Sequence, residues 1–305
     1  MAVTLVEAAK LSQSSLQRGV IETFVQESSI LDRIPFLTIE GNAYSYNEEG
    51  ALPGVSFRSV NEAYTESTGT VNQKSESLVI LGGDADVDKF IVRTRGNLND
   101  QRATQTRMKV KAASYYFQDQ FFNGDVAVTP KGFDGLKKRL VGAQVIDTAT
   151  NGMGPVAGGH DFFDALDALI AAVPGLNGSN GAVYANAGIM AKIKSSARRL
   201  GGVEMIREAL TQKMILTYNG IPLLDPGQTA AGADIIPRTE TQGTAAGTSS
   251  SIYAVKFGQD EGDKAVTGLT NGGVQSYDLG ELQEKPAYRT RIEFYTGLAV
   301  FGGKA

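Results

Sequence analysis

The first hydrophobic pattern along the chain is that of a helix near its amino-terminal end. Apolar side chains recur at roughly helical spacing through residues 3–27, at Leu5, Ala8, Ala9, Leu16, Val20 and Phe24. Such spacing places them on one face of a helix. The pattern ends before Pro35, because the residue that precedes a proline avoids the helical region of backbone conformation. Residues 36–47 then alternate between apolar and polar side chains, which predicts a strand.

Residues 48–77 form a long polar stretch that has no hydrophobic stripe. Its apolar side chains are scattered, among them Val55, Phe57, Val60, Tyr64 and Val71. We interpret the stretch as a two-stranded excursion whose tip lies near residues 61–70. An isolated hairpin is at best marginally stable in water. This one must therefore lie against something, either the body of its own chain or another subunit.

A long helix follows the polar stretch. Residues 78–94 first return to strand-like apolar runs around a predicted turn at Gly82-Gly83. The predicted helix covers residues 99–122, with Asn97 or Asn99 as its cap. One of its faces carries Ala103, Thr106, Val110, Ala113, Phe117 and Phe121. About 24 residues at about 1.5 Å each give a rod of roughly 36 Å, a length typical of the spine of a domain.

The Gly-rich residues 151–160 mark a predicted boundary between two parts of the chain. Beyond them the pattern alternates, with helices predicted at 161–173, 186–200 and 203–211 and strands at 181–186 and 214–224. Residues 226–251 are almost entirely small, polar or turn-forming, apart from the pair Ile235-Ile236, and are predicted to form a mobile or surface loop. The strand-rich segment after residue 252 is expected to return to the first part.

The composition excludes most kinds of chemistry. The 305 residues include no Cys and a single His, His160. A chain without Cys has no disulfide, thiolate nucleophile or Cys-ligated metal, and one His cannot build a multi-His metal site. His160 stands at a predicted helix start, where a structural role is more typical than a catalytic one. We therefore expect no catalytic residue, no cofactor and no metal.

The sequence supports neither a calcium loop nor a membrane span. Asp84, Asp86 and Asp88 imitate the start of a calcium loop, but the sixth and twelfth positions of that loop need Gly and Glu. Here those positions hold Lys89 and Arg95, so we interpret the acidic run as a solvated turn. No apolar run approaches the ~20 residues that a membrane span needs, and the first residues show no secretory leader. We expect no membrane partner and a reducing cytoplasm as the place of synthesis.

Charge is distributed unevenly along the chain, whose formal net charge is −4. Residues 1–90 carry a net charge of −7, residues 91–213 of +6 and residues 214–305 of −3. Clustered Lys and Arg in the middle third could bind nucleic acid. Exposed helix faces explain the clusters more simply, because aromatic side chains are not interleaved with them. As a third interpretation, the acidic first third could meet the basic middle third within one chain or in a neighbouring copy.

Taken in order, LPGVSFRSVNEAYTESTGTV and NDQRATQTRMKVKAASYYFQDQFFNG resemble the extended loop and the spine helix of a known family, the major capsid proteins of tailed bacteriophages with the Hong Kong ninety-seven type of shell fold. VYANAGIMAKIKSSARR followed by YNGIPLLDPG is similar to its axial domain. SSIYAVKFG and KPAYRTRIEFYTGLAVFG resemble its closing strands. The resemblance covers nearly the whole chain.

This resemblance implies an α+β fold divided into named parts. They are an N-terminal arm at 1–35, a strand with the extended loop at 36–94, a peripheral domain at 95–150 with its spine helix at 99–122, an axial domain at 151–251 and closing strands at 252–305. Copies of the chain would form the hexamers and pentamers of an icosahedral shell around double-stranded DNA, which they would contact without sequence preference. The family also implies assembly in the host cytoplasm, a separate scaffolding protein, a portal and a surface open to decoration proteins. Some relatives crosslink a Lys to an Asn between subunits, and Lys74 is the position here to compare with them.

The resemblance and the pattern together suggest contact residues between subunits. Along the extended loop we expect Val55, Phe57 and Tyr64 to face a neighbour, with Arg58, Glu62 and Glu66 as charged groups at the rim. From the arm we expect Leu5, Leu16 and Phe24 to do the same. Two alternatives stay open: an encapsulin, which is a cellular compartment of the same fold that encloses cargo enzymes, and a soluble enzyme that uses His160.

Overall fold

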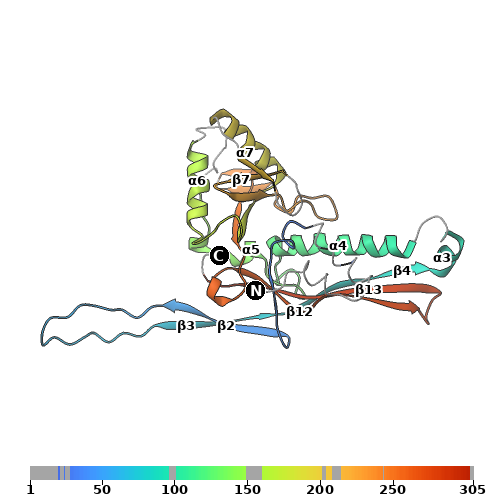
Figure 1. Cartoon of the computed structure of the whole chain (residues 1–305), viewed down its shortest axis with the longest axis horizontal. Coiled ribbons are helices and arrows are strands. Elements are labelled where there is room, and N and C mark those ends of the chain that lie inside the picture. Colours follow the sequence, from blue (N-terminus) through green and yellow to red (C-terminus); the bar gives the residue numbers. More distant parts are fainter. Residues whose placement is uncertain are drawn as a thin grey trace.

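The structure is a computed structural model that describes residues 20, 24, 28–95, 101–148, 160–200, 204–207, 214–242 and 244–302. It has a long flat body, a second unit that rises from one end of that body, and a thin hairpin that projects from the same end (Figure 1). Of the predicted helix at 3–27, the described residues are Val20 and Phe24, and both are helical and buried. Leu5 and Leu16 lie outside the described residues.

The body is built on a four-stranded sheet. Its strands are β1 (Phe36–Thr38), β12 (Val266–Glu281), β13 (Ala287–Val300) and β4 (Val79–Asp88), in that order. β1 runs parallel to β12, and the other pairs are antiparallel. The two C-terminal strands therefore occupy the centre of a sheet whose edges come from the first third of the chain. The predicted strand at 36–47 is divided between β1 and β2 (Ala43–Ala51), with Gly41 at φ +95° in the turn between them.

Helix α4 (Gln101–Asn123) lies along one face of this sheet (Figure 1). It covers nearly the predicted range, and its buried side chains are Thr106, Val110, Ser114, Phe117, Gln118, Phe121 and Phe122. Because strand side chains alternate between faces, Ile292 and Phe294 of β13 point into the core that includes Val110 and Phe117. The rings of Phe24, Phe36 and Phe117 surround Phe294 with centroid separations of 5.5, 5.6 and 6.0 Å.

Strand β4 differs from the sequence prediction at two points. Gly82-Gly83 forms no turn, because the strand runs unbroken from Val79 to Asp88 along β13. A Cβ atom on Gly82 would lie 2.3 Å from the Ile292 carbonyl oxygen, so a glycine is needed where the strands approach closely. The strand also ends at Asp88, whose Oδ1 accepts a hydrogen bond of 2.7 Å from the Phe90 N–H at the start of helix α3 (Lys89–Arg95).

The second unit is a five-stranded sheet with two helices. The strand order is β11 (Tyr253–Lys256), β5 (Gly181–Tyr184), β8 (Ile221–Leu224), β7 (Met214–Tyr218) and β6 (Glu204–Arg207), and the helices are α6 (His160–Ala171) and α7 (Ala187–Leu200). The predicted strand at 214–224 is an antiparallel pair, because Asn219 and Gly220 both adopt positive φ in the turn. The predicted helix at 203–211 is wrong within the described residues, since Glu204–Arg207 pairs with β7 as a strand.

The two units share buried side chains. On β5, Ala182 and Tyr184 belong to the core of the body, whereas Val183 between them belongs to the core of the second unit. Phe122 of α4 lies at the boundary between the two sheets. Its ring centroid is 5.5 Å from that of Tyr184 and 5.1 Å from that of Tyr253. Strand β5 and the C-terminal end of α4 therefore join the body and the second unit through shared buried side chains.

The segment 226–251 is attached to this body rather than loose. It contains the strands β9 (Glu240–Gln242) and β10 (Ala245–Ser249), which pair with each other. Ile235 and Ile236 are each 1% exposed and belong to the core of the body. The Asn123 side-chain amide donates to the Ile235 carbonyl at 2.8 Å. The prediction of a mobile loop is corrected at this point, because the one apolar pair in the segment acts as its anchor. The remaining short elements are α5 (Leu136–Arg139), η1 (Gly142–Gln144) and η2 (Glu261–Asp263).

Candidate functional site

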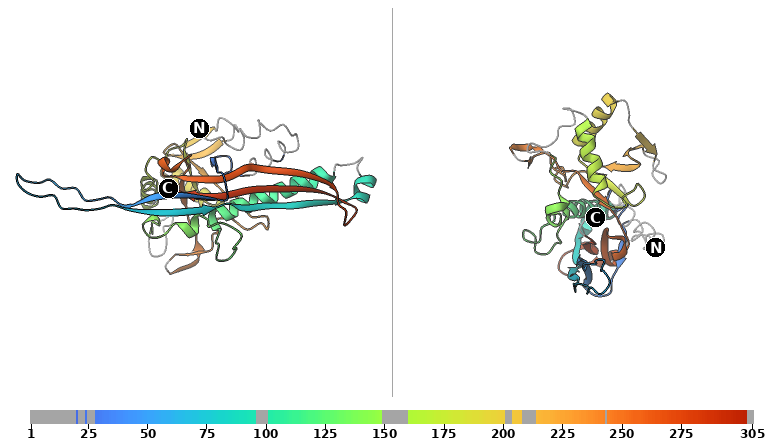
Figure 2. Two further views of the ribbon diagram at one scale, coloured as in Figure 1. Left: turned by 90° about the horizontal axis from the view of Figure 1, so that it is seen from below. Right: turned by 90° about the vertical axis from the view of Figure 1, so that its left-hand side faces the viewer.

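The most unusual surface of the molecule is a hairpin that leaves the body, formed by residues 43–77 and called here the projecting hairpin. Its stem pairs β2 with β3 (Thr70–Ser77), and the ladder ends in a register irregularity between Glu49 and Ala51. Residues 52–69, called here the tip segment, continue outward without ladder pairing and turn at Asn61, where φ is +68°. Two perpendicular views show the hairpin extending past every other element (Figures 1 and 2).

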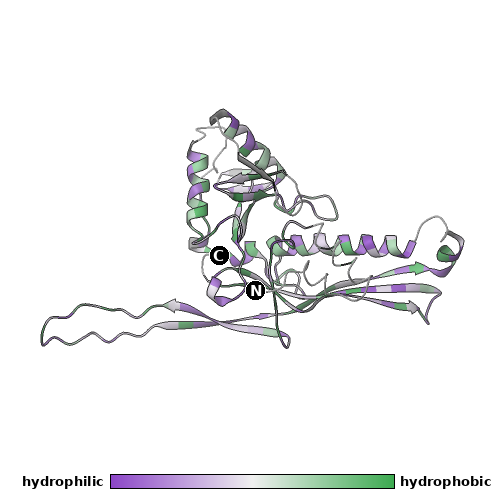
Figure 3. Ribbon diagram, in the orientation of Figure 1, coloured by the Kyte–Doolittle hydropathy of each residue, from purple (hydrophilic) through white to green (hydrophobic). Residues whose placement is uncertain are grey.

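Every residue from 49 to 75 is exposed in the isolated chain. The exposed fractions include 96% for Val55, 105% for Phe57 and 67% for Tyr64. Leu52 and Val60 are 78% and 90% exposed. Figure 3 shows hydrophobic positions on this hairpin well away from the body. A row of large apolar side chains in water is unfavourable and marks an interaction surface.

Polar contacts shape the turn of the tip segment. Arg58 Nη1 donates to the carbonyl oxygens of Ser59 and Glu62 at 3.3 Å each, and its guanidinium lies 5.2 Å from the centroid of the Tyr64 ring. The Glu62 carboxylate accepts a hydrogen bond of 2.9 Å from the Ser59 N–H. Arg58 and Glu62 thus have partners inside the hairpin, and Glu66 is exposed. A rim role for these three charges stays a prediction.

Phe24 does not belong among the predicted contact residues. It is 1% exposed, packs against Phe294 and has its carbonyl oxygen 3.0 Å from the donating Ser114 hydroxyl. Its ring fills the core of its own chain, so no surface is left for a neighbour. Periodicity alone cannot distinguish an apolar stripe that packs on the home sheet from one that packs on another copy.

The base of the projecting hairpin is held on one face, which sequence reasoning missed. The Tyr46 ring is 3% exposed, lies 4.8 Å from the Phe301 ring centroid and donates its hydroxyl to the Val300 carbonyl at 3.1 Å. The Tyr44 hydroxyl donates to Glu261 Oε1 at 2.8 Å. On the paired strand, Glu76 accepts two hydrogen bonds from the Arg139 guanidinium, one of them 2.7 Å long between Nη2 and Oε2.

The phenols of Tyr44 and Tyr46 are expected to make this base sensitive to alkali. Burial raises the pKa of Tyr46 to about 12, with the charge of Glu76 adding to the effect, and burial with the Glu261 hydrogen bond raises that of Tyr44 to about 12. Since the unfolded chain loses these protons near pH 10, stability is complete below pH 10 and falls as the pH rises toward 12. For Tyr46 the loss is on the order of 2 kcal/mol.

We predict that the free energy of unfolding of the parent falls between pH 10 and 12. The free energy of unfolding of Tyr46→Phe should fall less over the same interval. The measurement is urea unfolding at several pH values, followed by far-UV circular dichroism. The exposed Tyr64 is the matched control, so Tyr64→Phe should follow the parent. An equal fall for Tyr46→Phe and the parent would contradict the assignment.

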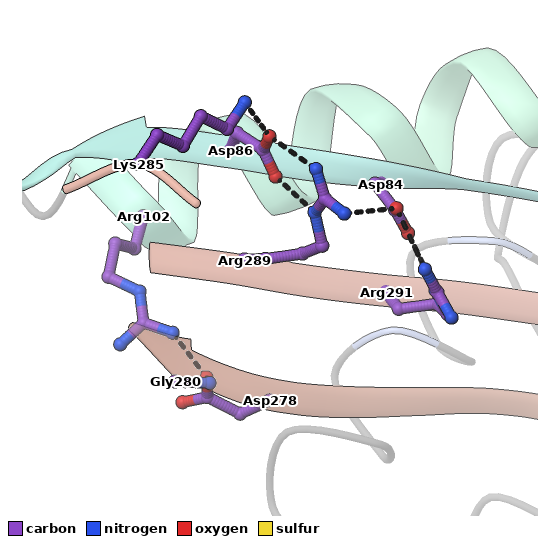
Figure 4. Close-up of polar contacts among 8 residues, drawn as sticks. All are labelled: Asp84, Asp86, Arg102, Asp278, Gly280, Lys285, Arg289 and Arg291. Atoms are coloured by element: carbon purple, nitrogen blue, oxygen red, sulfur yellow. Dashed lines mark hydrogen bonds and ion pairs between the residues drawn. The ribbon is translucent and has the colours of Figure 1, made fainter. Parts of the chain in front are cut away.

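The acidic run on β4 is an ion-pair network and not a solvated turn. Asp84 and Asp86 lie directly opposite Arg291 and Arg289 of β13 in the strand register (Figure 4). Arg289 Nε donates to Asp86 Oδ1 at 2.7 Å, and Arg291 Nε donates to Asp84 Oδ1 at 2.8 Å. Lys285 also lies beside Asp86, and its Nζ is 2.5 Å from Oδ2. Hydrogen bonds from the arginines hold the pKa values of both carboxyl groups below their usual range, so the pairs persist at neutral pH.

The described part of the chain shows neither a metal-binding group nor a membrane-spanning helix. No group of three or more His, Cys, Asp or Glu side chains there could hold a metal ion. Within the same residues, no helix is long and apolar enough to span a membrane. His160 is the first residue of α6.

Residues 12–156 match a family model described as Major capsid protein GP7. No curated protein matches the chain. The matched residues are just under half of the chain, and the description of the model names a structural protein, in agreement with the prediction that the chain is not an enzyme.

Solved structures with the same fold span nearly the whole chain. The SrpI encapsulin of Synechococcus elongatus has a TM-score of 0.64 at 16% identity, over 99% of this chain and 93% of its own. The capsid of a native GTA particle has a TM-score of 0.62 at 13% identity, over 91% and 87%. Mycobacterium phage Bobi has a TM-score of 0.55 at 14% identity, over 100% and 95%. The α+β shell fold predicted from the sequence is therefore confirmed.

Proposed function

We propose that this chain, a major capsid protein of the Hong Kong ninety-seven type shell fold, closes with copies of itself into the icosahedral shell around the double-stranded DNA of a tailed phage. The observation that supports the proposal most is the projecting hairpin. All of its residues from 49 to 75 are exposed, and Val55 and Phe57 are almost fully so. A surface of this kind becomes stable when a neighbouring copy covers it.

In this proposal the parts of the molecule take the roles that the family implies. The projecting hairpin is the extended loop, α4 is the spine helix, and the unit with α6 and α7 is the axial domain that points to the symmetry axes of hexamers and pentamers. The hairpin projects from one end of a long body, so its contact with the next copy would be heterologous. Such contacts close into rings when the rotation between copies permits.

The remaining partners follow from the same proposal. Assembly in the host cytoplasm would use a separate scaffolding protein and a portal, and decoration proteins would bind the outer surface. The packaged DNA would meet the inner wall through its phosphates, without recognition of bases.

An encapsulin is the second candidate, because an encapsulin shares the fold over nearly the whole chain. The contents of purified shells distinguish the two. Nuclease-protected DNA in shells purified from infected or induced cells supports the capsid, whereas a co-purified enzyme without DNA supports the compartment.

The contact surface is tested by substitution of one exposed ring. We expect Phe57→Ser to reduce the yield of closed shells at least about tenfold, because each copy would lose an apolar contact worth about 1.5–3 kcal/mol, while the isolated chain keeps its melting temperature. Ile80→Ser is the matched control, since Ile80 is 72% exposed on β4, outside the hairpin. Negative-stain microscopy and sedimentation measure the yield. Equal yields from Phe57→Ser and the parent would contradict the proposed contact.

A further inference from the structure

The base of the projecting hairpin is tied to the body at three points on one face. Residues directly opposite each other in an antiparallel ladder share a face, and Tyr44 lies opposite Glu76 while Tyr46 lies opposite Lys74. Tyr44 contacts Glu261 of η2, Tyr46 contacts Phe301, and Glu76 contacts Arg139 of α5. The other face of the stem, which includes Ser45, is exposed, and its contact with the body is a long ion pair of 3.9 Å between Lys264 Nζ and Glu49 Oε2.

The contact between Arg139 and Glu76 is the most directional of the three. Two donors of the planar guanidinium meet the two carboxylate oxygens, an arrangement that fixes orientation as well as distance. The side chains are only 17% and 18% exposed. Arg139 is itself fixed, because its Nε donates to the Asp134 carbonyl at 2.7 Å.

The stem transmits the orientation set by the contact between Arg139 and Glu76 to the tip segment. The ladder runs from Ala43 to Ala51, nine residues that span about 30 Å at about 3.3 Å each. A rotation of about 10° at the base would move the outer end of that ladder by about 5 Å, which is about the spacing between neighbouring strands. An error of that size would bring the tip segment to a different place on a neighbour.

We propose that Arg139 and Glu76, with Tyr46 beside them, are positioning residues that set the angle at which the hairpin leaves the body and, through that angle, the diameter of the shell. The effect on the shell rests on the proposed function. The effect on the angle does not, and it can be measured on the unassembled chain.

The angle is measured with two spin labels. The chain has no Cys, so Thr70→Cys at the outer end of the stem, opposite Ala51, and Gln105→Cys on α4, both exposed, give one labelled pair. We expect a narrow distance distribution in the parent and one broadened by about 5 Å or more in Glu76→Gln. Arg139→Gln should broaden it equally, and the double variant no further, because both residues act through one contact. Circular dichroism establishes that the variants stay folded.

Lys74→Gln is the matched control. Lys74 and Glu48 form an ion pair of 2.6 Å between the two strands of the hairpin, with no link to the body. Loss of this ion pair in Lys74→Gln should leave the distance distribution narrow and the shells uniform. Glu76→Gln should instead give shells of mixed diameter, as measured by electron microscopy.

Three results would overturn the inference. A distance distribution as narrow in Glu76→Gln as in the parent would show that the contact does not set the angle. Equal broadening by Lys74→Gln would show that any ion pair on the hairpin has this effect. A broadened distance distribution in Glu76→Gln, together with shells as uniform as those of the parent, would show that the angle of the hairpin does not set the diameter of the shell. A parent that forms no shells would contradict the proposed function, and the distance measurement would still decide the angle.

Discussion

Replacing residues 50–70 by Asn-Gly is expected to abolish shell assembly and to leave a folded chain. Glu49 and Val71 lie directly opposite each other in the ladder, so a two-residue turn can join them without a change of register. The removed residues contribute no buried side chain to the isolated molecule. The free energy of unfolding should therefore change by less than about 1 kcal/mol.

The comparison needs a control for length. A variant in which residues 52–69 become Gly and Ser in equal number keeps the reach of the hairpin but loses its apolar side chains. We expect it to fail in assembly as well, with an unchanged melting temperature. Normal closed shells from either variant, seen by negative-stain microscopy, would contradict the role of the tip segment.

The largest expected loss of stability comes from Phe122→Ala. The Phe122 ring is 0% exposed and lies against Phe121, Tyr184 and Tyr253 at the point where the two units meet. Truncation of a buried Phe to Ala costs about 3–5 kcal/mol, because it removes apolar contact and leaves a cavity. Urea unfolding followed by circular dichroism measures the loss.

Tyr116→Ala on the same helix is the control for Phe122→Ala. Tyr116 is 46% exposed, so its truncation should cost at most about 0.5 kcal/mol. The parent should unfold in one transition, because β5 and α4 contribute side chains to the junction of both units. Two separate transitions, or a small loss for Phe122→Ala, would show that the units do not share a core.

The local pattern of apolar and polar residues correctly predicted elements whose form depends mainly on residues within the segment. The apolar face of α4 repeats over 23 residues, and the predicted range of 99–122 is close to Gln101–Asn123. The projecting hairpin was predicted from a lack of pattern, since a stretch without a hydrophobic stripe cannot cover itself. In both cases the physical cause lies in the residues of the segment.

The wrong predictions concern structure that depends on distant partners. Residues 204–207 form a strand because β7 lies beside them, and Gly82-Gly83 continues a strand because β13 pairs with it over more than 200 positions of sequence. Isolated short helices and strands have little stability of their own, so the partner decides their form. No local signal could have shown that partner.

The same limit applies to the residues of the candidate site. The exposure of Val55 and Phe57 agrees with the pattern of the sequence, whereas the burial of Phe24 does not. The contact between Glu76 and Arg139 joins residues 63 positions apart. A carboxylate and a guanidinium in two polar segments give no sign, before the chain folds, that they will meet.

A cryo-electron microscopy reconstruction of the particles that the intact chain forms tests the central claim most directly. We predict closed shells in which residues 49–75 of each copy lie against a neighbouring copy, with Val55 and Phe57 buried at the contact. A chain that stays single at every concentration, or shells in which this hairpin folds onto its own body or stands free in solvent, would contradict the account.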